Sequence, residues 1–238
     1  MHLSVIIPTL NEEYYIQGTL DALTDGLSKG TECEVIVIDS GSNDKSLEYI
    51  KNRNVTLVKK PEFKGCKYKS LNFGASLANG NVLLFLDADS FLMHGFDEQI
   101  KKSQKENVVG GAFEYCSENR SFSFRLVEAL NRARYRVDQN YFGDQGIFCT
   151  KEAFDAVGGY PEKPIMEAAY FCKKLRSIGK LKLIKLPLIT SSRRFEKGGI
   201  WRVFFKDTWI WIQFLLGLDI SRYASEYWQE NLLEFKKQ

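Results

Sequence analysis

Short apolar runs alternate with helix-period patterns along the first half of the chain, which is typical of repeated strand–helix units. The apolar runs predict strands near residues 3–8, 34–38, 55–58 and 82–86. The amphipathic patterns predict helices near residues 12–27, 43–52, 66–79 and 95–104. Because parallel strands need a crossover connection, this order predicts right-handed βαβ units. The predicted fold class is α/β, with a Rossmann-like mixed, mostly parallel sheet flanked by helices.

The second half of the chain has a less regular pattern. Strands are expected near 108–115 and 181–186, and helices near 121–137 (basic and amphipathic), near 165–179, from about Gly199 (aromatic) and over 222–236. Pro161 and Pro164 punctuate a loop, and no linker separates two parts of the chain. Residues 1–238 are therefore predicted to form a single domain.

The most informative segment is the strand pattern that ends in two acids. Five apolar residues, 82–86, precede Asp87 and Asp89, which are separated by one residue. Open α/β sheets bind ligands at the carboxyl ends of their parallel strands. Carboxylate oxygens in that place suit Mg²⁺ or Mn²⁺ carrying a diphosphate. The alternative interpretation is a solvated strand end, because Asp is a common turn residue.

Composition excludes several classes of protein. The net charge of +3 gives no support to nucleic-acid binding. The five cysteines are scattered singly without zinc-site spacing, which argues against a zinc site or a disulfide scaffold and fits a reducing cytosol. The N-terminus has a strand pattern, not a signal-peptide pattern, and no run of 18 apolar residues occurs. We expect a cytoplasmic protein without a transmembrane span.

Two strand ends limit the ligand. The first predicted strand runs into residues 8–13, which contain no glycine, so a dinucleotide-binding Rossmann loop is not expected. The second predicted strand ends at Asp39, whose carboxylate can accept hydrogen bonds from a ribose or a base.

Four motifs of the first half occur in the order and spacing of a known family. They are Val5-Ile6-Ile7-Pro8-Thr9-Leu10-Asn11-Glu12-Glu13, then Val37-Ile38-Asp39-Ser40-Gly41-Ser42-Asn43-Asp44, the segment from Gly65 to Gly74 with Asn72, and Leu86-Asp87-Ala88-Asp89 in DxD form. Over about the first 115 residues the chain resembles family 2 glycosyltransferases of the GT-A fold. The later runs 143–148, 157–161, 164–167 and 191–196 resemble the acceptor side of a short bacterial subgroup without a transmembrane domain.

The resemblance implies a role for each matching position. Residues 1–115 would bind the nucleotide-sugar, 116–198 would form the acceptor side, and 199–238 would be a C-terminal helical appendage. The nucleotide pocket would be lined by Pro8, Thr9 and Glu12, with Asp39 and Lys67 near the base or ribose. Asp89 would bind the metal, Asp87 the metal or the ribose, and Arg194 (with Arg193) phosphate oxygens. The implied cofactor is Mn²⁺ or Mg²⁺.

One position departs from the family pattern. Inverting members carry a Glu-Asp pair at the start of the helix after the Gly-Gly loop, and the Asp is the general base. This chain has Glu167-Ala168-Ala169 there. Neighbouring helix positions point about 100° apart, so Glu167 does not simply replace the missing Asp. Three explanations are open: Glu167 (first candidate) or Asp144 (second) is the base, the protein binds donor without turnover, or the alignment is shifted by one residue.

The predicted function is metal-assisted, inverting transfer of a sugar from a UDP- or GDP-sugar to a hydroxyl group of a saccharide, lipid-linked or small acceptor. One alternative is a catalytically impaired nucleotide-sugar-binding protein, favoured by Ala168. A second alternative is a nucleotidyltransferase, which would need a glycine-rich basic loop that the first strand end lacks.

The segment 200–218 is unusually apolar and holds three of the four tryptophans. Charged residues interrupt it, so it is not expected to span a bilayer. Two interpretations are open: a helix buried against the domain or in a homodimer, or an in-plane helix in peripheral contact with the cytoplasmic membrane face.

Overall fold

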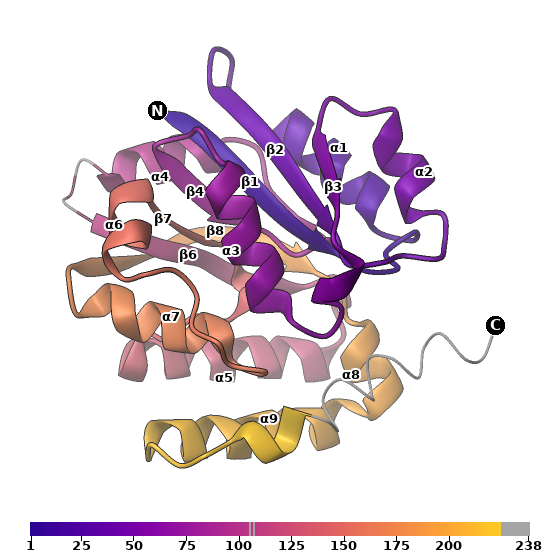
Figure 1. Cartoon of the computed structure of the whole chain (residues 1–238). Coiled ribbons are helices and arrows are strands. Elements are labelled where there is room, and N and C mark those ends of the chain that lie inside the picture. The colour runs from indigo at the N-terminus through magenta and orange to yellow at the C-terminus, as the bar shows by residue number, and fades with distance from the viewer. Residues whose placement is uncertain (105, 107, 225–238) are drawn as a thin grey trace.

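A curled sheet of eight strands crosses the computed structural model, which describes residues 1–104, 106 and 108–224 (Figure 1). The strand order is β3-β2-β1-β4-β7-β6-β8-β5. The strands are β1 (His2–Thr9), β2 (Glu32–Asp39), β3 (Thr56–Lys59), β4 (Val82–Phe85), β5 (Ser90–Phe91), β6 (Val108–Ser117), β7 (Ile147–Thr150) and β8 (Lys180–Thr190). β1 to β4 pair in parallel, whereas β7 is antiparallel to both of its neighbours.

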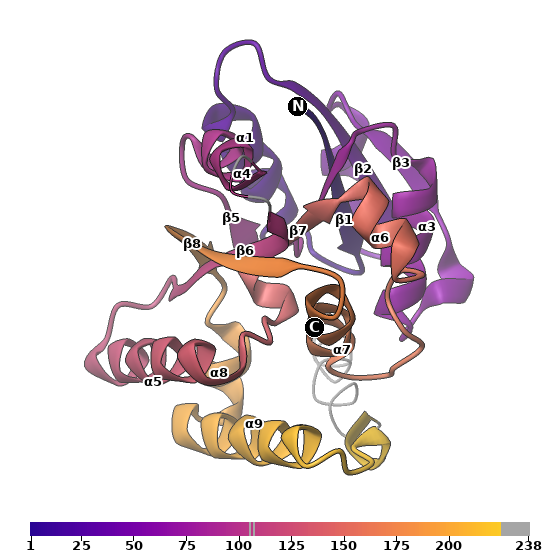
Figure 2. The same cartoon turned by 90° about the vertical axis from the view of Figure 1, so that its left-hand side faces the viewer.

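Helices cover both faces of this sheet. They are α1 (Ile16–Gly26), α2 (Ser46–Lys51), α3 (Lys67–Leu77), α4 (Phe96–Gln104), α5 (Phe122–Asp138), α6 (Lys151–Ala156), α7 (Glu167–Arg176), α8 (Arg193–Gly198) and α9 (Ile200–Leu215). The described residues also form three single-turn 3₁₀ helices: η1 (Pro61–Phe63), η2 (Gly143–Gln145) and η3 (Ser221–Tyr223). Figure 2 shows α1 and α4 on one side of the sheet and α3, α6 and α7 on the other.

The central strands are buried on both faces, as continuous apolar runs predict. Successive residues of β1 point to opposite faces: Val5 packs in one hydrophobic cluster with residues of α1 and α4, and Ile6 packs in another with residues of α3 and α7. Both side chains are fully buried. Since β1, β2 and β4 are parallel neighbours, their carboxyl ends reach the same edge of the sheet.

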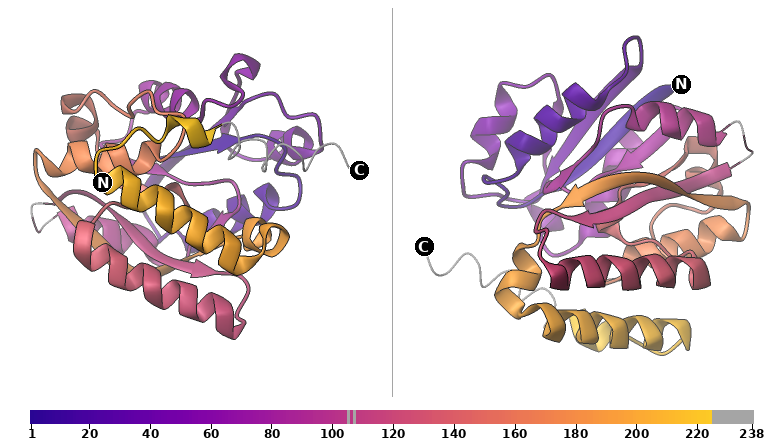
Figure 3. Two further views of the ribbon diagram at one scale, coloured as in Figure 1. Left: turned by 90° about the horizontal axis from the view of Figure 1, so that it is seen from below. Right: turned by 180° about the vertical axis from the view of Figure 1, so that it is seen from behind.

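The segment 193–215 forms a layer beside the sheet rather than part of it. α9 lies below α5 and α7 (Figure 1), and the view from below shows α5 and α9 next to each other (Figure 3). α9 buries Ile210 and Phe214 in a cluster with Ile165 and Ala169 of the α7 region. Its opposite side exposes large aromatic side chains. The helix is thus buried on one face and exposed on the other. The buried face agrees with packing against the domain, and the exposed face is available for a second copy of the chain or a membrane surface.

The predicted α/β class and most elements are confirmed, with boundaries shifted by a few residues. The sequence patterns missed β5, β7, α6 and α8, each six residues or shorter. Segments this short carry too few positions for a period to appear. Of the helix expected over 222–236, residues 225–238 lie outside the described part of the chain. Within that part, no helix combines the length and the apolar character that crossing a membrane requires.

Candidate functional site

A cavity of about 380 Å³ opens at the edge where β1, β2 and β4 end. Its wall is built from the segments after these strands, together with η2, the start of α7, and α8 and α9. Nearly all of the sequence-predicted site residues line it: Pro8, Thr9, Glu12, Lys67, Asp87, Asp89, Asp144, Glu167, Arg193 and Arg194. Residues up to 186 positions apart in the chain, Pro8 and Arg194, therefore meet in one place.

Asp39 is the exception among the predicted site residues. It is buried and does not belong to the cavity wall, although its neighbour Ser40 does. Its carboxylate accepts hydrogen bonds from the backbone N–H groups of Gly41 and Ser42. Gly41 has a φ of +98°, a conformation that favours glycine. In this structure Asp39 therefore holds the loop that follows β2.

Each acid of the predicted metal pair contacts a cation. Lys67 Nζ lies 2.6 Å from Oδ1 of Asp87. Arg193 Nη2 lies 3.2 Å from Oδ2 of Asp89. The same guanidinium donates two hydrogen bonds to the carboxylate of Glu12, over 2.6 and 2.8 Å. Arg193 thus bridges the loop after β1 and the loop after β4.

Burial changes the protonation of these acids. Burial raises the pKa of Glu12 to about 7, against the opposing effect of Arg193. Burial also raises the pKa of Asp89 to about 6, and the negative charge of Asp87 adds to this shift while Arg193 opposes it. Asp87 and Asp89 therefore repel each other across the cavity wall, a repulsion that a bound cation relieves.

The two candidate bases lie in the same wall. Burial raises the pKa of Asp144 to about 6, and Asp87 raises it further while Arg134 and Lys67 oppose the shift. Burial likewise raises the pKa of Glu167, the first residue of α7, with Lys67 opposing. Carboxyl groups that titrate closer to neutral pH are better matched to proton transfer from a hydroxyl group. Ala168, beside Glu167, also lines the cavity.

Local contacts set the position of Asp144 within η2. The buried side chain of Gln145 accepts a hydrogen bond from the Phe142 N–H and donates one to the Phe113 carbonyl of β6. Gly143 lets η2 approach the Lys67 ammonium closely, because a Cβ at this position would lie 2.9 Å from Nζ. The Gly-Asp-Gln run is therefore shaped by packing against both β6 and α3.

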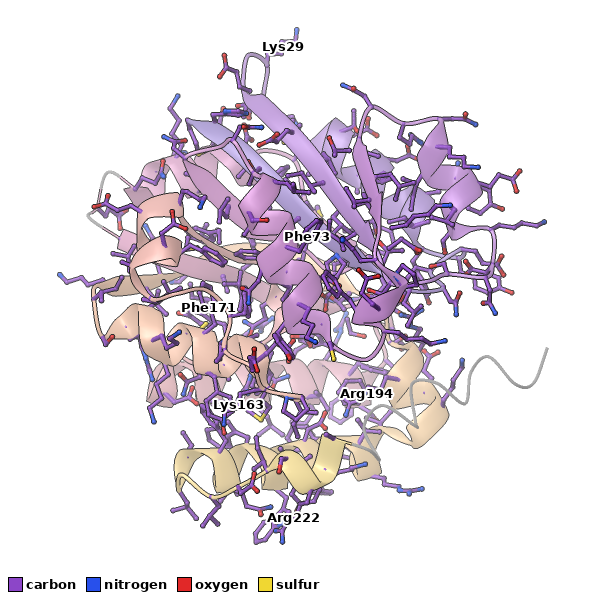
Figure 4. All side chains as sticks on the ribbon, viewed as in Figure 1. Lys29, Phe73, Lys163, Phe171, Arg194 and Arg222 are labelled. Carbon is purple, nitrogen blue, oxygen red and sulfur yellow. The ribbon has the colours of Figure 1, made fainter. Side chains whose placement is uncertain are left out.

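Arg194 of α8 forms an ion pair with α9, the helix below the sheet in Figure 1. Its guanidinium donates to both carboxylate oxygens of Asp207 on α9, over 2.9 and 2.7 Å. Arg194, labelled in Figure 4, lies just above α9 in that view. This bidentate pair ties α8 to α9 beside the cavity.

Several lining residues were not foreseen from the sequence. They are Tyr115, Asn131, Arg134, Phe142, Asp207 and Trp211. The guanidinium carbon of Arg134 lies 3.8 Å from the centre of the Phe142 ring. The basic amphipathic pattern over 121–137 predicted the helix α5, but no spacing rule shows that this helix lines the cavity.

A divalent cation was predicted at Asp87 and Asp89. Within the described ranges, no group of three or more His, Cys, Asp or Glu side chains is arranged to hold a metal ion. Mg²⁺ is commonly bound by one or two carboxylates together with substrate phosphate oxygens. The repelling pair Asp87 and Asp89 is a donor set of that kind, so the residues fit such an ion.

Comparison with known proteins gives one family. A family model described as "Glycosyl transferase family 2" matches residues 4–154. An uncharacterized glycosyltransferase of Haemophilus influenzae is 25% identical over 225 residues, which cover 86% of this chain and 88% of that protein. Glycosyltransferase AglE of Haloferax volcanii is 35% identical over 172 residues, covering 67% of this chain and 56% of AglE.

Solved structures share the fold. Staphylococcus aureus TarS 1–349 in complex with UDP superposes with a TM-score of 0.65 at 18% identity, covering 80% of this chain and 60% of that one. The mannosyltransferase PcManGT of Pyrobaculum calidifontis, with GDP-Man and Mn²⁺, superposes with a TM-score of 0.60 at 19% identity. The match covers 80% of this chain and 56% of that one. Glucosyl-3-phosphoglycerate synthase of Mycobacterium tuberculosis, with Mn²⁺ and UDP, superposes with a TM-score of 0.63 at 17% identity. The match covers 92% of this chain and 81% of that one. These neighbours confirm the predicted GT-A fold class.

Proposed function

The chain belongs to glycosyl transferase family 2, and on that premise we propose that it transfers a sugar from a nucleotide-sugar to a hydroxyl group of an acceptor. The observation that carries the proposal is the cavity at the ends of β1, β2 and β4, where Asp87 and Asp89 face Lys67 and Arg193. Such a mixture of carboxylates and cations suits a diphosphate together with a divalent ion.

The donor occupies the part of the cavity formed by the first half of the chain in this proposal. Pro8, Thr9, Glu12 and Ser40 line that part, and Asp39 supports it by holding the loop after β2. The nucleotide is UDP or GDP, in line with the UDP and GDP-Man complexes of the structural neighbours. Residues 1–115 bind the donor, 116–198 the acceptor, and 199–238 form the appendage.

Asp87 and Asp89 would hold Mn²⁺ or Mg²⁺, ions that the neighbouring structures contain. When bound, such an ion offsets the charge that develops on the departing diphosphate. The chain's own cations act beside it: Lys67 and Arg193 keep the two carboxylates in place and add positive charge near the phosphate oxygens.

In an inverting transfer, the base takes the proton of the acceptor hydroxyl as that oxygen attacks the sugar. Glu167 and Asp144 are the two carboxylates proposed for it, because both line the cavity and both have a raised pKa. Ala168 has no proton-accepting group where inverting relatives of this type carry an Asp. The second candidate function is binding of the nucleotide-sugar donor without turnover. The methyl side chain of Ala168, which cannot accept a proton, favours this second function.

The proposal is tested by measuring nucleoside diphosphate release from a panel of UDP- and GDP-sugars, with Mg²⁺ or Mn²⁺ and a set of hydroxyl acceptors. Release that depends on acceptor supports the transferase. Donor affinity without release supports the second candidate. Release of pyrophosphate from UTP or GTP in the presence of a sugar 1-phosphate, measured in parallel, contradicts both in favour of a nucleotidyltransferase.

We also propose that α5 and α9 bring the cavity to an anionic lipid surface. Exposed apolar side chains follow the four-residue helical spacing on both helices: Phe122, Leu126 and Leu130 on α5, and Trp201, Phe205 and Trp209 on α9. The exposed cations Arg125 and Arg202 lie on the same two helices. Aromatic side chains flanked by arginine suit the headgroup region of a membrane, where a lipid-linked acceptor is found.

A further inference from the structure

Arg134 of α5 has a charged group in the cavity wall that the proposed reaction does not use. Its Nε and Nη2 atoms are buried and have no hydrogen-bond partner. Within residues 1–104, 106 and 108–224, no carboxylate forms a salt bridge with Arg134 in the structure. Leaving buried donors without acceptors is costly, more so when the donor is charged. This arrangement is expected where a ligand supplies the acceptors.

The two free nitrogens define the shape of that ligand. Nε–H and one N–H of Nη2 point in the same direction along one edge of a guanidinium, so together they form a fork. A fork of parallel N–H groups matches two oxygens of a carboxylate or a phosphate, which it binds bidentately. A neutral hydroxyl group offers one oxygen and fills half of this site.

Aromatic rings pack around the guanidinium. Its carbon lies 3.8 Å from the centre of the Phe142 ring, 4.9 Å from that of Tyr135 and 5.8 Å from that of Trp211. Contact with ring faces stabilises the cation without consuming its hydrogen-bond donors. Phe142 is adjacent to η2, so Arg134 and the candidate base Asp144 are positioned by the same turn.

Arg134 forms neither of the ion pairs with Asp87 and Asp89. Its charge lowers the pKa of Asp144, as the charges of Lys67 and Arg194 also do. Lys67 pairs with Asp87, and Arg194 pairs with Asp207. The hydroxyl group of Tyr115, on β6 beside α5, is also buried in the cavity wall without a hydrogen-bond partner. Two of the unpartnered donors in the cavity wall, those of Arg134 and Tyr115, thus come from α5 and β6; the hydroxyl group of Thr9 after β1 is another.

We propose that Arg134 binds an anionic group, a carboxylate or a phosphate, carried by the acceptor. The proposal rests on the transferase function above and narrows it: the acceptor is an acidic molecule whose hydroxyl group is presented next to Asp144 and Glu167. The donor diphosphate is the other source of the same anion chemistry, and the experiment distinguishes the two.

The test uses the full chain and inorganic phosphate as the probe. Nucleotide affinity is measured first, with UDP and GDP in the presence of Mg²⁺. Inorganic phosphate is then titrated calorimetrically into the nucleotide-saturated protein and into the protein alone. Arg134→Gln removes the charge, and Arg134→Lys keeps the charge but loses the fork, which covers the case in which the glutamine variant does not fold. Lys101→Gln removes a positive charge at an exposed position of α4 that does not line the cavity.

Phosphate is expected to bind the nucleotide complex of the native protein. Arg134→Gln is expected to weaken phosphate binding by about 10–100-fold and Arg134→Lys by less, as for a charge-assisted bidentate contact. Nucleotide affinity is expected to stay within about 3-fold in both variants, and Lys101→Gln is expected to change neither affinity.

Three results overturn the proposal. They are phosphate affinity that is unchanged by Arg134→Gln, phosphate binding that disappears when nucleotide occupies the protein, and nucleotide affinity that falls together with phosphate affinity. The last two assign the guanidinium to the donor diphosphate. Failure of UDP and GDP to bind the native protein contradicts the proposed function instead, and the titration without nucleotide then still tests the anion site.

Discussion

The ammonium nitrogen of Lys67 lies 2.6 Å from Oδ1 of Asp87, and this pair joins the start of α3 to the end of β4 inside the cavity wall. About a quarter of each side chain is exposed, so the pair is shielded from water more than a surface ion pair is. Gly143 of η2 packs against it, since a Cβ there would lie 2.9 Å from Nζ. The start of α3, the turn η2 and the acidic pair after β4 therefore meet at one ion pair.

Replacing Lys67 tests whether this ion pair contributes to nucleotide binding. Lys67→Met is expected to lower nucleoside diphosphate affinity about 10-fold, because it removes a cation near the phosphates and leaves the Asp87 carboxylate without its partner. Calorimetric titration with UDP and GDP measures the change. Lys69→Met, at an exposed position of the same helix, is the matched control. Equal affinities for the two variants would remove Lys67 from donor binding.

Neutral replacement of the acidic pair tests the metal. The double variant Asp87→Asn, Asp89→Asn is expected to lose the dependence of nucleotide affinity on Mg²⁺ or Mn²⁺, and turnover is expected to fall by at least about 100-fold. Affinity with and without a chelator, together with the rate of donor turnover, gives both quantities. Asp25→Asn, on the exposed side of α1, is the control. Persistent metal dependence in the double variant contradicts the assignment.

The general base is tested by comparing two single variants. Glu167→Gln is expected to lower sugar transfer by about 10²–10⁴-fold while donor affinity changes little, because the amide cannot accept the acceptor's proton. Asp144→Asn is measured in parallel by the same rate and affinity assays. A large loss in Asp144→Asn alone transfers the role to Asp144. Full turnover in both variants excludes both carboxylates.

The raised pKa of Asp144 predicts a pH dependence of stability. Burial favours the protonated carboxyl group, so its folded-state pKa of about 6 exceeds the unfolded value. The protonated Asp144 carboxyl group therefore contributes its full stabilisation of the folded state below the unfolded pKa, and this stabilisation is lost as pH rises through about 6. Asp144→Asn cannot ionise, and we expect it to exceed the native protein in unfolding free energy by on the order of 1–3 kcal/mol at neutral pH.

Urea denaturation at about pH 4.5 and about pH 7.5 measures this effect. The advantage of the Asn variant should be much smaller at the lower pH. A difference that is the same at both values would show that the carboxyl group is not buried in the way the structure has it.

Contact with lipid is tested on the exposed face of α9. The native protein is expected to float with anionic vesicles, and the double variant Phe205→Ser, Trp209→Ser is expected to bind several-fold more weakly, since it loses buried apolar area. Both side chains are more than half exposed, so the change leaves the packed face of α9 intact. Neutral vesicles are the control for charge. Absence of flotation, with a concentration-dependent dimer in sedimentation, would assign this face to a second copy of the chain.

The family and the enzyme class, a glycosyltransferase, were predicted from local motifs and are confirmed by the family match. Local sequence was sufficient because strand ends position side chains directly: a residue that follows a parallel strand lies at the sheet edge whatever the rest of the chain does. Pro8, Asp87 and Asp89 line the cavity for this reason. Asp39 also follows a strand, but its carboxylate turns to the amides of its own loop, which a strand pattern does not reveal.

The chain's hydrophobic periods determined the alternation of elements, the parallel half of the sheet and the acidic pair at its edge, since these depend on contacts between near neighbours in sequence. Only the tertiary structure decided which cations face those acids, that α9 shares the cavity wall, and that the Arg134 guanidinium rests on Phe142 with its buried Nε and Nη2 unpartnered. These features arise from segments of separate helices and turns that meet after folding. The direction of a long side chain there depends on packing partners far away in the chain, which no local pattern encodes.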